Sequence, residues 1–328
     1  MDHVVRVSRS FHHGTHLASL SIGVARARAA AMVLRALAGE AAAASKQTTP
    51  GLAAIRLGFW RESATASIRG SDSTRNGSQA EAGPGLGDGS SAPVIVALRA
   101  LGAEALIGNS ALNRRRLRQI VENSARCSAR GSILESDSGD SSQLYVQRMS
   151  DMEAMAEGVD GNILFLANTV ARAAAKEEDT NVDEFEHAAS HIGKAVGIVR
   201  MIQNSPMLAA ERKSVLPMEL CLKFGLVMED LFRGNSSEQL RDTIHAVASV
   251  AHGHLAQARD VRHIRMEKIP KSSRPILLPA IVAQQYLDLL EQREFDIFHP
   301  DVQNIDSGGF RQLRLQMLLT YSSLVGKF

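Results

Sequence analysis

The chain has 328 residues, of which 45% are hydrophobic and 22% are charged. Its formal net charge is only +2, so no strong positive field attracts nucleic acid, and we expect no nucleic-acid binding. Two cysteines, Cys127 and Cys221, are too few for a disulfide framework and fit a reducing compartment. Length and apolar content together predict a soluble globular protein with a substantial buried core.

The first 46 residues are rich in arginine and poor in acid. Asp2 and Glu40 are their only acidic residues, and such a composition is typical of an organellar transit segment. From about Leu17 onward, the same stretch also has the character of the first helices of a fold. Residues 1–30 are therefore either a targeting segment or an N-terminal helical segment, and both interpretations hold if targeting information overlaps the start of the fold.

Two polar stretches interrupt the rest of the chain. Residues 71–93 are rich in Gly, Ser and Asp and lack aromatics, which predicts a disordered insertion. Residues 136–142 (SDSGDSS) predict a solvated polar loop between helices. Neither stretch has the character of a domain boundary, so residues 31–328 are predicted to form a single domain.

Outside these stretches the apolar residues follow the period of α-helices, and no convincing alternating strand is present. One buried helical stripe is defined by steps of three and four through Phe185, Ala188, Ile192, Ala195, Val199 and Ile202. Similar patterns occur in residues 94–106, 117–121, 149–175, 240–258, 279–290 and 313–324. Helices are expected to stop at Pro206, Pro217, Pro270 and Pro300. The predicted fold class is all-α.

Membrane-spanning and metal-binding segments are not expected. The longest apolar run toward the C-terminal part, residues 275–283, is well short of the roughly 20 residues that span a bilayer. His187 and His191 have a spacing compatible with zinc, but no third ligand or HExxH glutamate accompanies them. His252 and His254 are two apart and point to different helix faces. Structural roles are favoured for these histidines, and no cofactor is expected.

Residues 187–219 combine a long helical pattern, a turn and the sequence Leu-Pro-Met-Glu-Leu at 216–220. This frame resembles the segment of squalene and phytoene synthases in which two aspartates, four residues apart, hold Mg²⁺. Asn204 and Leu208 occupy the positions of those aspartates here. Side chains four apart lie on one helix face, and Mg²⁺ prefers carboxylate oxygens. An amide and an isobutyl group are not expected to replace that pair.

The earlier Asp-rich motif of the same family is also degenerate. Residues 34–37 (LRAL) resemble the start of the helix that carries it, but residues 38–46 continue as AGEAAAASK, with Glu40 as their only acid. The resemblance implies an isoprenoid synthase-like helical bundle that lacks both metal clamps. Ionising a diphosphate needs metal or a comparable cationic clamp, so no catalytic residues, metal ligands or enzymatic activity are expected.

One row of residues is the candidate lining of any remaining cavity. The family's diphosphate-facing row corresponds to Gly197, Arg200, Asn204 and Leu208 in this chain. Arg200 could hold an anion or a lipid headgroup there, or it could pair with a neighbouring carboxylate and fill space. The second interpretation is favoured because an unpaired buried charge is costly.

Three longer strings carry a closer resemblance within this superfamily. They are residues 187–195 (HAASHIGKA), 216–221 (LPMELC) and 295–300 (FDIFHP), with a weaker match at 58–60 (GFW). On these strings the chain is similar to the non-enzymatic branch of mitochondrial complex I assembly factors, the assembly factor 6 family. The resemblance implies a pseudoenzyme scaffold, peripheral to the matrix side of the inner membrane, whose partners are complex I assembly intermediates or subunits.

Two alternatives stay open at this point. A divergent prenyltransferase would bind an isoprenoid diphosphate through Arg200, Lys194, Arg212 or Lys213 in place of magnesium. An isoprenoid or lipid carrier would keep the apolar cavity without turnover. The aromatic residues of the segment 295–300 could likewise cap the core or dock a partner.

Overall fold

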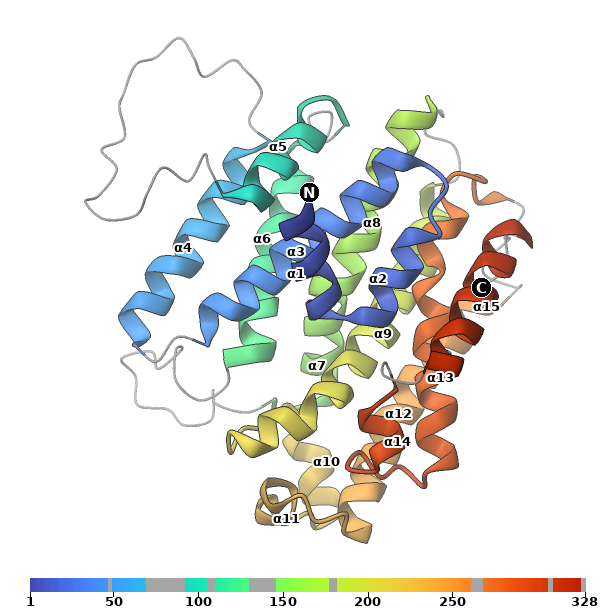
Figure 1. Cartoon of the computed structure of the whole chain (residues 1–328). Helices are drawn as coiled ribbons and strands as arrows, with labels where there is room; N and C mark the ends of the chain where they lie inside the picture. The colour runs from blue at the N-terminus through green and yellow to red at the C-terminus, as the bar shows by residue number, and fades with distance from the viewer. Residues whose placement is uncertain are drawn as a thin grey trace.

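The computed structural model is a bundle of helices (Figure 1). It describes residues 1–46, 49–68, 92–105, 110–129, 146–176, 182–260, 268–305 and 309–325. Within these ranges every regular element is a helix and no strand is present, which confirms the all-α prediction. The predicted polar loop at 136–142 lies outside the described residues, as does the predicted insertion 71–93 except for residues 92 and 93.

Three groups of helices follow one another along the chain. The first group comprises α1 (Asp2–Phe11), α2 (His13–Leu20), α3 (Ala25–Ser45), α4 (Pro50–Ala66), α5 (Pro93–Ala105) and α6 (Ser110–Ala129). A continuous stretch then holds α7 (Met149–Ala156), the π-helical turn η4 (Glu157–Gly161) and α8 (Asn162–Ala175). The last group comprises α9 (Val182–Ala210), α10 (Met218–Lys223), α11 (Met228–Arg233), α12 (Glu238–Arg259), the 3-10 turn η6 (Arg274–Leu277), α13 (Pro279–Gln292), α14 (Pro300–Gln303) and α15 (Gly309–Val325). None of the helices described is both long and apolar enough to cross a bilayer.

Helix α9 is the longest element, with 29 residues, and it packs against α7, η4, α12 and α13. The six residues of its predicted apolar stripe, from Phe185 to Ile202, are all buried. Asp183 and Glu184 occupy its first turn, where negative charge interacts favourably with the helix dipole. Burial of the stripe against several neighbours supplies the hydrophobic stabilisation that holds this helix at the centre of the main core.

The prediction that Pro206 ends this helix is wrong, because α9 continues to Ala210. Proline removes a backbone N–H donor and usually breaks a helix interior. Beyond Pro206, however, Leu208 and Ala209 are each about 1% exposed and belong to the main core. Their burial offsets the missing backbone hydrogen bond, so tertiary packing carries the last turn of α9 past the proline.

The other expected proline stops lie outside helix interiors, as predicted. Pro217 precedes α10, Pro270 lies between α12 and η6, and Pro300 is the first residue of α14. Proline suits a first helical position because its missing N–H would have no partner inside the helix there.

Backbones of α9 and η4 approach each other unusually closely. A Cβ atom added at Gly193 would lie 2.4 Å from the Cα atom of Gly161, and one added at Gly197 would lie 2.6 Å from the Cα atom of Ala156. Only glycine permits such contact between backbones. The close approach sets the distance between α9 and the turn that carries Asp160.

The N-terminal helices pack onto the bundle. Helix α1 lies along α3, and Val4 and Leu34 are buried in a second core cluster between them and α5, α6 and α8. A Cβ atom at Gly39 of α3 would lie 2.9 Å from Cγ1 of Val7, so α1 and α3 are also in close contact. Residues 1–30 thus form α1, α2 and the start of α3 and pack onto the bundle, while a targeting role for them stays a prediction.

The aromatic segment 295–300 caps the main core. Ile297 is 1% exposed, and Phe295 and Phe298 are half-buried against the same cluster. The His299 side chain accepts a hydrogen bond from the backbone N–H of Asp301 and so caps α14. These contacts account for the two aromatic side chains through core packing.

We expect Gly193→Ala to lower the free energy of unfolding by about 1–3 kcal/mol, because the new methyl group would meet the backbone of Gly161. Urea unfolding followed by circular dichroism measures this change. Gly253→Ala in α12 is the matched control, since a Cβ there meets nothing within 4 Å. The control should raise the free energy by about 0.5–1 kcal/mol. Equal effects at both positions would contradict the close contact of α9 with η4.

Candidate functional site

Arg200 and Asp160 form a buried ion pair between α9 and η4. Nε and Nη2 of Arg200 both donate to Oδ2 of Asp160, at 3.1 Å and 3.0 Å. The two side chains are only 2% and 5% exposed. Burial alone would lower the pKa of Arg200, but the Asp160 carboxylate outweighs it and the net shift is upward. The guanidinium therefore stays charged inside the bundle.

A second guanidinium, that of Arg35 on α3, lies in the same interior region. It is 2% exposed, and its Nη1 donates to Oγ of Ser19 at 2.7 Å. Burial lowers the pKa of Arg35 to about 10, partly opposed by the charge of Asp160. Asp160 is the only acidic residue among the buried side chains of the described ranges. Two arginines thus share the field of one carboxylate, which gives this interior a positive character.

The junction of α1 and α2 covers this part of α9. The ring of Phe11 lies 4.8 Å from Cζ of Arg200, within cation–π range. His12 Nε2 lies 2.7 Å from Oε1 of Gln203, a distance suited to a hydrogen bond. The N-terminal segment therefore contacts α9 at Arg200, a member of the ion pair, and at Gln203, about one turn further on.

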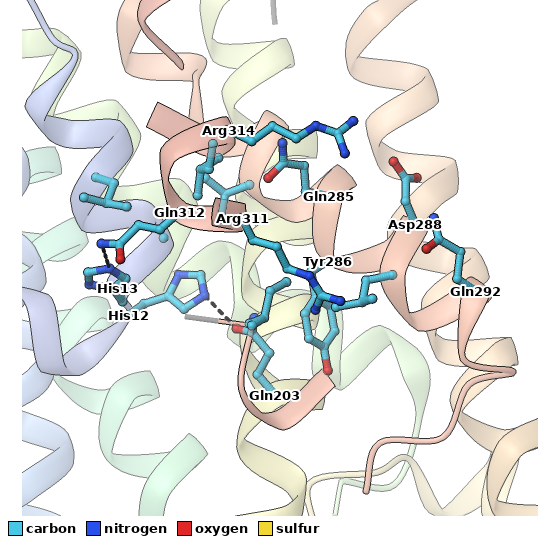
Figure 2. Close-up of a pocket in the computed structure, with 16 residues that line it drawn as sticks. His12, His13, Gln203, Gln285, Tyr286, Asp288, Gln292, Arg311, Gln312 and Arg314 are labelled. Atoms are coloured by element: carbon cyan, nitrogen blue, oxygen red, sulfur yellow. Dashed lines mark hydrogen bonds between the residues drawn. The ribbon is translucent and has the colours of Figure 1, made fainter. Parts of the chain in front are cut away.

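Two neighbouring hollows border this junction and share His12, His13, Gln203, Tyr286 and Ile305 in their linings. The larger, of about 280 Å³, is also lined by Asn204. The smaller, of about 180 Å³, lies between α2, α13 and α15 and is shown in Figure 2, where Gln312 faces His13 and the Arg311 side chain extends toward Tyr286. Burial raises the pKa of Tyr286 well above its usual range, so its hydroxyl stays protonated.

The four residues predicted to line a cavity lie in different surroundings. Gly197 packs against Ala156, and Arg200 is held by Asp160. Asn204 is half-buried and lines the larger hollow, whereas Leu208 is 1% exposed in the main core. The ion-pair interpretation of Arg200 matches its observed contacts. A shared lining role for the whole row stays a prediction.

The other cations considered for diphosphate binding also face carboxylates. Nζ of Lys194 lies 3.5 Å from Glu157. Nη2 of Arg212 lies 2.8 Å from Glu229, and Nζ of Lys213 lies 2.9 Å from Glu211. An anionic ligand would have to compete with these contacts at each position.

A histidine cluster joins α9 to α12 and α7. Nδ1 of His191 lies 3.0 Å from Nδ1 of His254, whose Nε2 lies 2.7 Å from Oε1 of Glu153. The rings of His187 and His191 are in edge contact, with centroids 4.8 Å apart. Burial, followed by the charges of His254, His187 and Lys194, lowers the pKa of His191 to about 4. His191 is therefore neutral at neutral pH.

No group of three or more His, Cys, Asp or Glu side chains in the described part of the chain is arranged to hold a metal ion. The two thiols, those of Cys127 and Cys221, are buried. Burial raises the pKa of Cys221 to about 11, which keeps that thiol protonated.

Reasoning from sequence did not identify Asp160 or the residues of the N-terminal cover, Phe11 and His12. One feature of the sequence does point to Asp160. It is the only acid between the apolar residues Val159 and Ile163, and an acid in such a segment is expected to be buried and paired with a cation such as an arginine. His12 and Gln203 are 191 positions apart in the sequence, and no sequence pattern predicts their contact.

Comparisons with known proteins agree with this architecture. The family model described as squalene/phytoene synthase matches residues 4–311. The mouse protein named NADH dehydrogenase (ubiquinone) complex I, assembly factor 6 is 36% identical over 155 residues, which are 47% of this chain and 43% of that protein. Its Drosophila melanogaster homolog is 27% identical over 304 residues, 92% of this chain and 77% of that one.

A solved structure has the same fold. The squalene synthase HpnC from Alicyclobacillus acidocaldarius superimposes with a TM-score of 0.60 at 13% identity, covering 89% of this chain and 93% of that one. By contrast, the matched region spans less than half the length of the mouse relative.

Replacing Asp160 by Asn should destabilise the protein by about 3–5 kcal/mol, because the buried Arg200 charge would lose its partner. Chemical unfolding of the purified chain measures this loss. Glu229→Gln is a matched control, since Glu229 also contacts two arginines, Arg212 and Arg233, but lies at the surface. Its effect should be far smaller. A loss at Asp160 no larger than at Glu229 would refute the ion pair's structural role.

Stability should fall when the pH is lowered from about 6.5 toward 4, and His191 should contribute to that fall. The folded chain binds a proton at His191 with a pKa of about 4, against 6.5 as the ordinary value. The unfolded chain therefore takes up more protons in this window, which favours unfolding. His191→Asn should lose less unfolding free energy than the wild type between neutral pH and about pH 5. His252→Asn, at an exposed position, should behave like the wild type. Identical pH profiles for all three proteins would contradict the assignment.

Proposed function

Because the chain belongs to the squalene/phytoene synthase family, we propose that it uses the family's helical bundle as a non-catalytic scaffold in the assembly of respiratory complex I. The observation that carries the proposal is the buried Arg200–Asp160 pair on the face of α9 that also presents Asn204 and Leu208. At the two positions that correspond to the family's paired aspartates, this chain has the amide Asn204 and the apolar Leu208, and Arg200 lies one turn before them.

Electrostatics supports the non-catalytic part of the proposal. A divalent cation near α9 would meet the charges of Arg200 and Arg35. The Asp160 carboxylate, the one buried in the part of the chain that the structure describes, already accepts two hydrogen bonds from Arg200. In a poorly solvated interior, repulsion between like charges is much stronger than in water. Magnesium also dehydrates reluctantly and needs anionic oxygens to compensate. Without the ion, ionisation of a prenyl diphosphate would need another cationic clamp, and the Arg200 guanidinium already donates two hydrogen bonds to Asp160.

The names of the relatives support the assembly role. The mouse protein and its Drosophila melanogaster homolog are both named as assembly factors of NADH dehydrogenase (ubiquinone) complex I. On this basis the partners of the chain are complex I subunits or assembly intermediates, and its site of action is the mitochondrion. The acid-poor, arginine-rich composition of residues 1–46 is in keeping with import into that organelle.

We place the chain on the matrix side of the inner membrane as a peripheral protein. Newly made subunits of the membrane arm would be its clients. A scaffold of this kind acts through its surface, so its activity should depend on folding and on exposed side chains rather than on the row at 197–208.

Expression of the full chain in cells that lack their own homologue should restore assembled complex I, as measured on blue-native gels. The variant Asn204→Ala should restore it to the same level, because the proposal gives no role to that amide. Asp160→Asn should restore it poorly, because the protein loses stability.

If a normally folded Asn204→Ala protein fails to restore complex I, the face of α9 that carries Asn204 and Leu208 has a functional role. Purified wild-type protein incubated with farnesyl diphosphate and Mg²⁺ supplies the second readout. Release of diphosphate in that assay would replace the scaffold with a divergent prenyltransferase, and an isoprenoid lipid purified in stoichiometric amount would point to a carrier.

A further inference from the structure

Helix α15 turns an apolar stripe toward solvent. Leu313, Met317, Tyr321 and Leu324 are 59%, 75%, 64% and 83% exposed. Their spacing of four, four and three residues places them on one face of the helix. Large apolar side chains gathered in this way mark an interaction surface more often than chance exposure does.

The opposite face of α15 packs against the helical bundle. Leu319 is 1% exposed and packs, together with Leu315, against α2 and α13. Oγ of Ser323 donates to the carbonyl oxygen of Ser21 at 3.0 Å, and Nε2 of Gln312 lies 3.0 Å from Nε2 of His13. Figure 1 shows the helix on the outside of the molecule, beside α13 and α2. These contacts fix the rotation of α15, so its apolar stripe is held outward.

The charged residues of α15 itself all have one sign. Residues 309–325 contain Arg311 and Arg314 and no acidic residue. Arg314 is exposed beside Leu313. On α1, the exposed Arg9 donates from Nε to Nδ1 of His13 at 3.2 Å, and His13 in turn contacts α15 through Gln312. Positive charge therefore gathers at the N-terminal end of the stripe.

The nearby acids are engaged with other groups. Asp301 lies 2.6 Å from Arg293 and 3.6 Å from Arg311. Asp288, which lines the same hollow as Arg314, accepts a hydrogen bond from Gln284 at 2.7 Å. Arg9 and Arg314 are thus the cations left to meet an anionic surface.

We propose that α15 is the membrane-docking element of this protein and lies in the plane of a bilayer that contains anionic phospholipid. Leu313, Met317 and Leu324 enter the boundary of the acyl chains, and Tyr321 lies at the interface as aromatic side chains do. Arg314 and Arg9 meet the phosphates of the headgroups. The inference rests on the proposed peripheral association with the membrane and names the surface responsible for it.

A bilayer fits this surface better than a protein groove does. The stripe stands on a convex helix, and its leucine and methionine side chains need no complementary pocket in a fluid surface. With 17 residues and two arginines, α15 does not meet the requirements for spanning a bilayer. An interfacial helix combines one apolar face with flanking cations in this way.

Co-sedimentation of the full chain with phosphatidylcholine vesicles containing cardiolipin tests the proposal. The triple variant Leu313→Ser, Met317→Ser, Leu324→Ser should bind at least about tenfold more weakly than the wild type. A matched variant, Ile55→Ser, Val96→Ser, Leu222→Ser, removes three exposed apolar side chains elsewhere and should bind normally. Arg314→Glu should weaken binding to these vesicles and leave the weaker binding to pure phosphatidylcholine unchanged. Melting temperatures should agree among all the proteins, because every changed side chain is exposed.

Equal binding by the wild type and the α15 triple variant would overturn the assignment to α15 and leave membrane association standing. If the wild type does not bind vesicles, both the docking surface and the peripheral location are wrong. The assembly role is tested separately by the complementation experiment. A third outcome would also overturn the proposal. If the wild type binds no vesicles and is a dimer in solution, and the α15 triple variant is a monomer, the stripe binds a second copy of the chain.

Discussion

The ion pair between Arg200 and Asp160 is the constraint on which the rest of this structure depends. A buried guanidinium requires a partner, and that partner comes from a π-helical turn held against α9 by the glycine contact at Gly193 and Gly161. The pair lies on the face of α9 that also carries Asn204 and Leu208. Arg35 is close enough to feel the same carboxylate, so two buried guanidinium groups face one buried carboxylate, and this interior repels cations.

The molecule therefore has an interior that is covered and positively charged, and a surface that is open to partners. Phe11 and His12 contact α9 over the ion pair, so the N-terminal helices cover the region that a reactive site would need to keep open. The hollows that remain beside the junction, of about 180 and 280 Å³, are lined largely by polar side chains. Under the proposed scaffold role, function depends on surface features such as α15, whose inner face is packed and whose outer face is apolar.

Much of this architecture could be predicted from local patterns. The apolar spacing along α9 specified a buried helix, and the need to pair a buried charge specified that Arg200 meets a carboxylate. Which carboxylate it meets depends on the approach of α9 to η4, a contact between segments far apart in sequence, so Asp160 was not identified. The expected stop at Pro206 fails for a related reason. Its local preference ends helices, whereas the burial of Leu208 and Ala209 is a tertiary effect that outweighs it.

The central claim is that the face of α9 formed by Arg200, Asn204 and Leu208 does not bind a divalent cation. Manganese, which replaces Mg²⁺ at carboxylate sites and is visible by electron paramagnetic resonance, tests it on the purified protein. The account predicts that the signal of free Mn²⁺ is the same with and without the protein throughout a titration. Stoichiometric loss of the free signal in the wild type, abolished by Asn204→Ala, would place a cation on α9 and contradict the account.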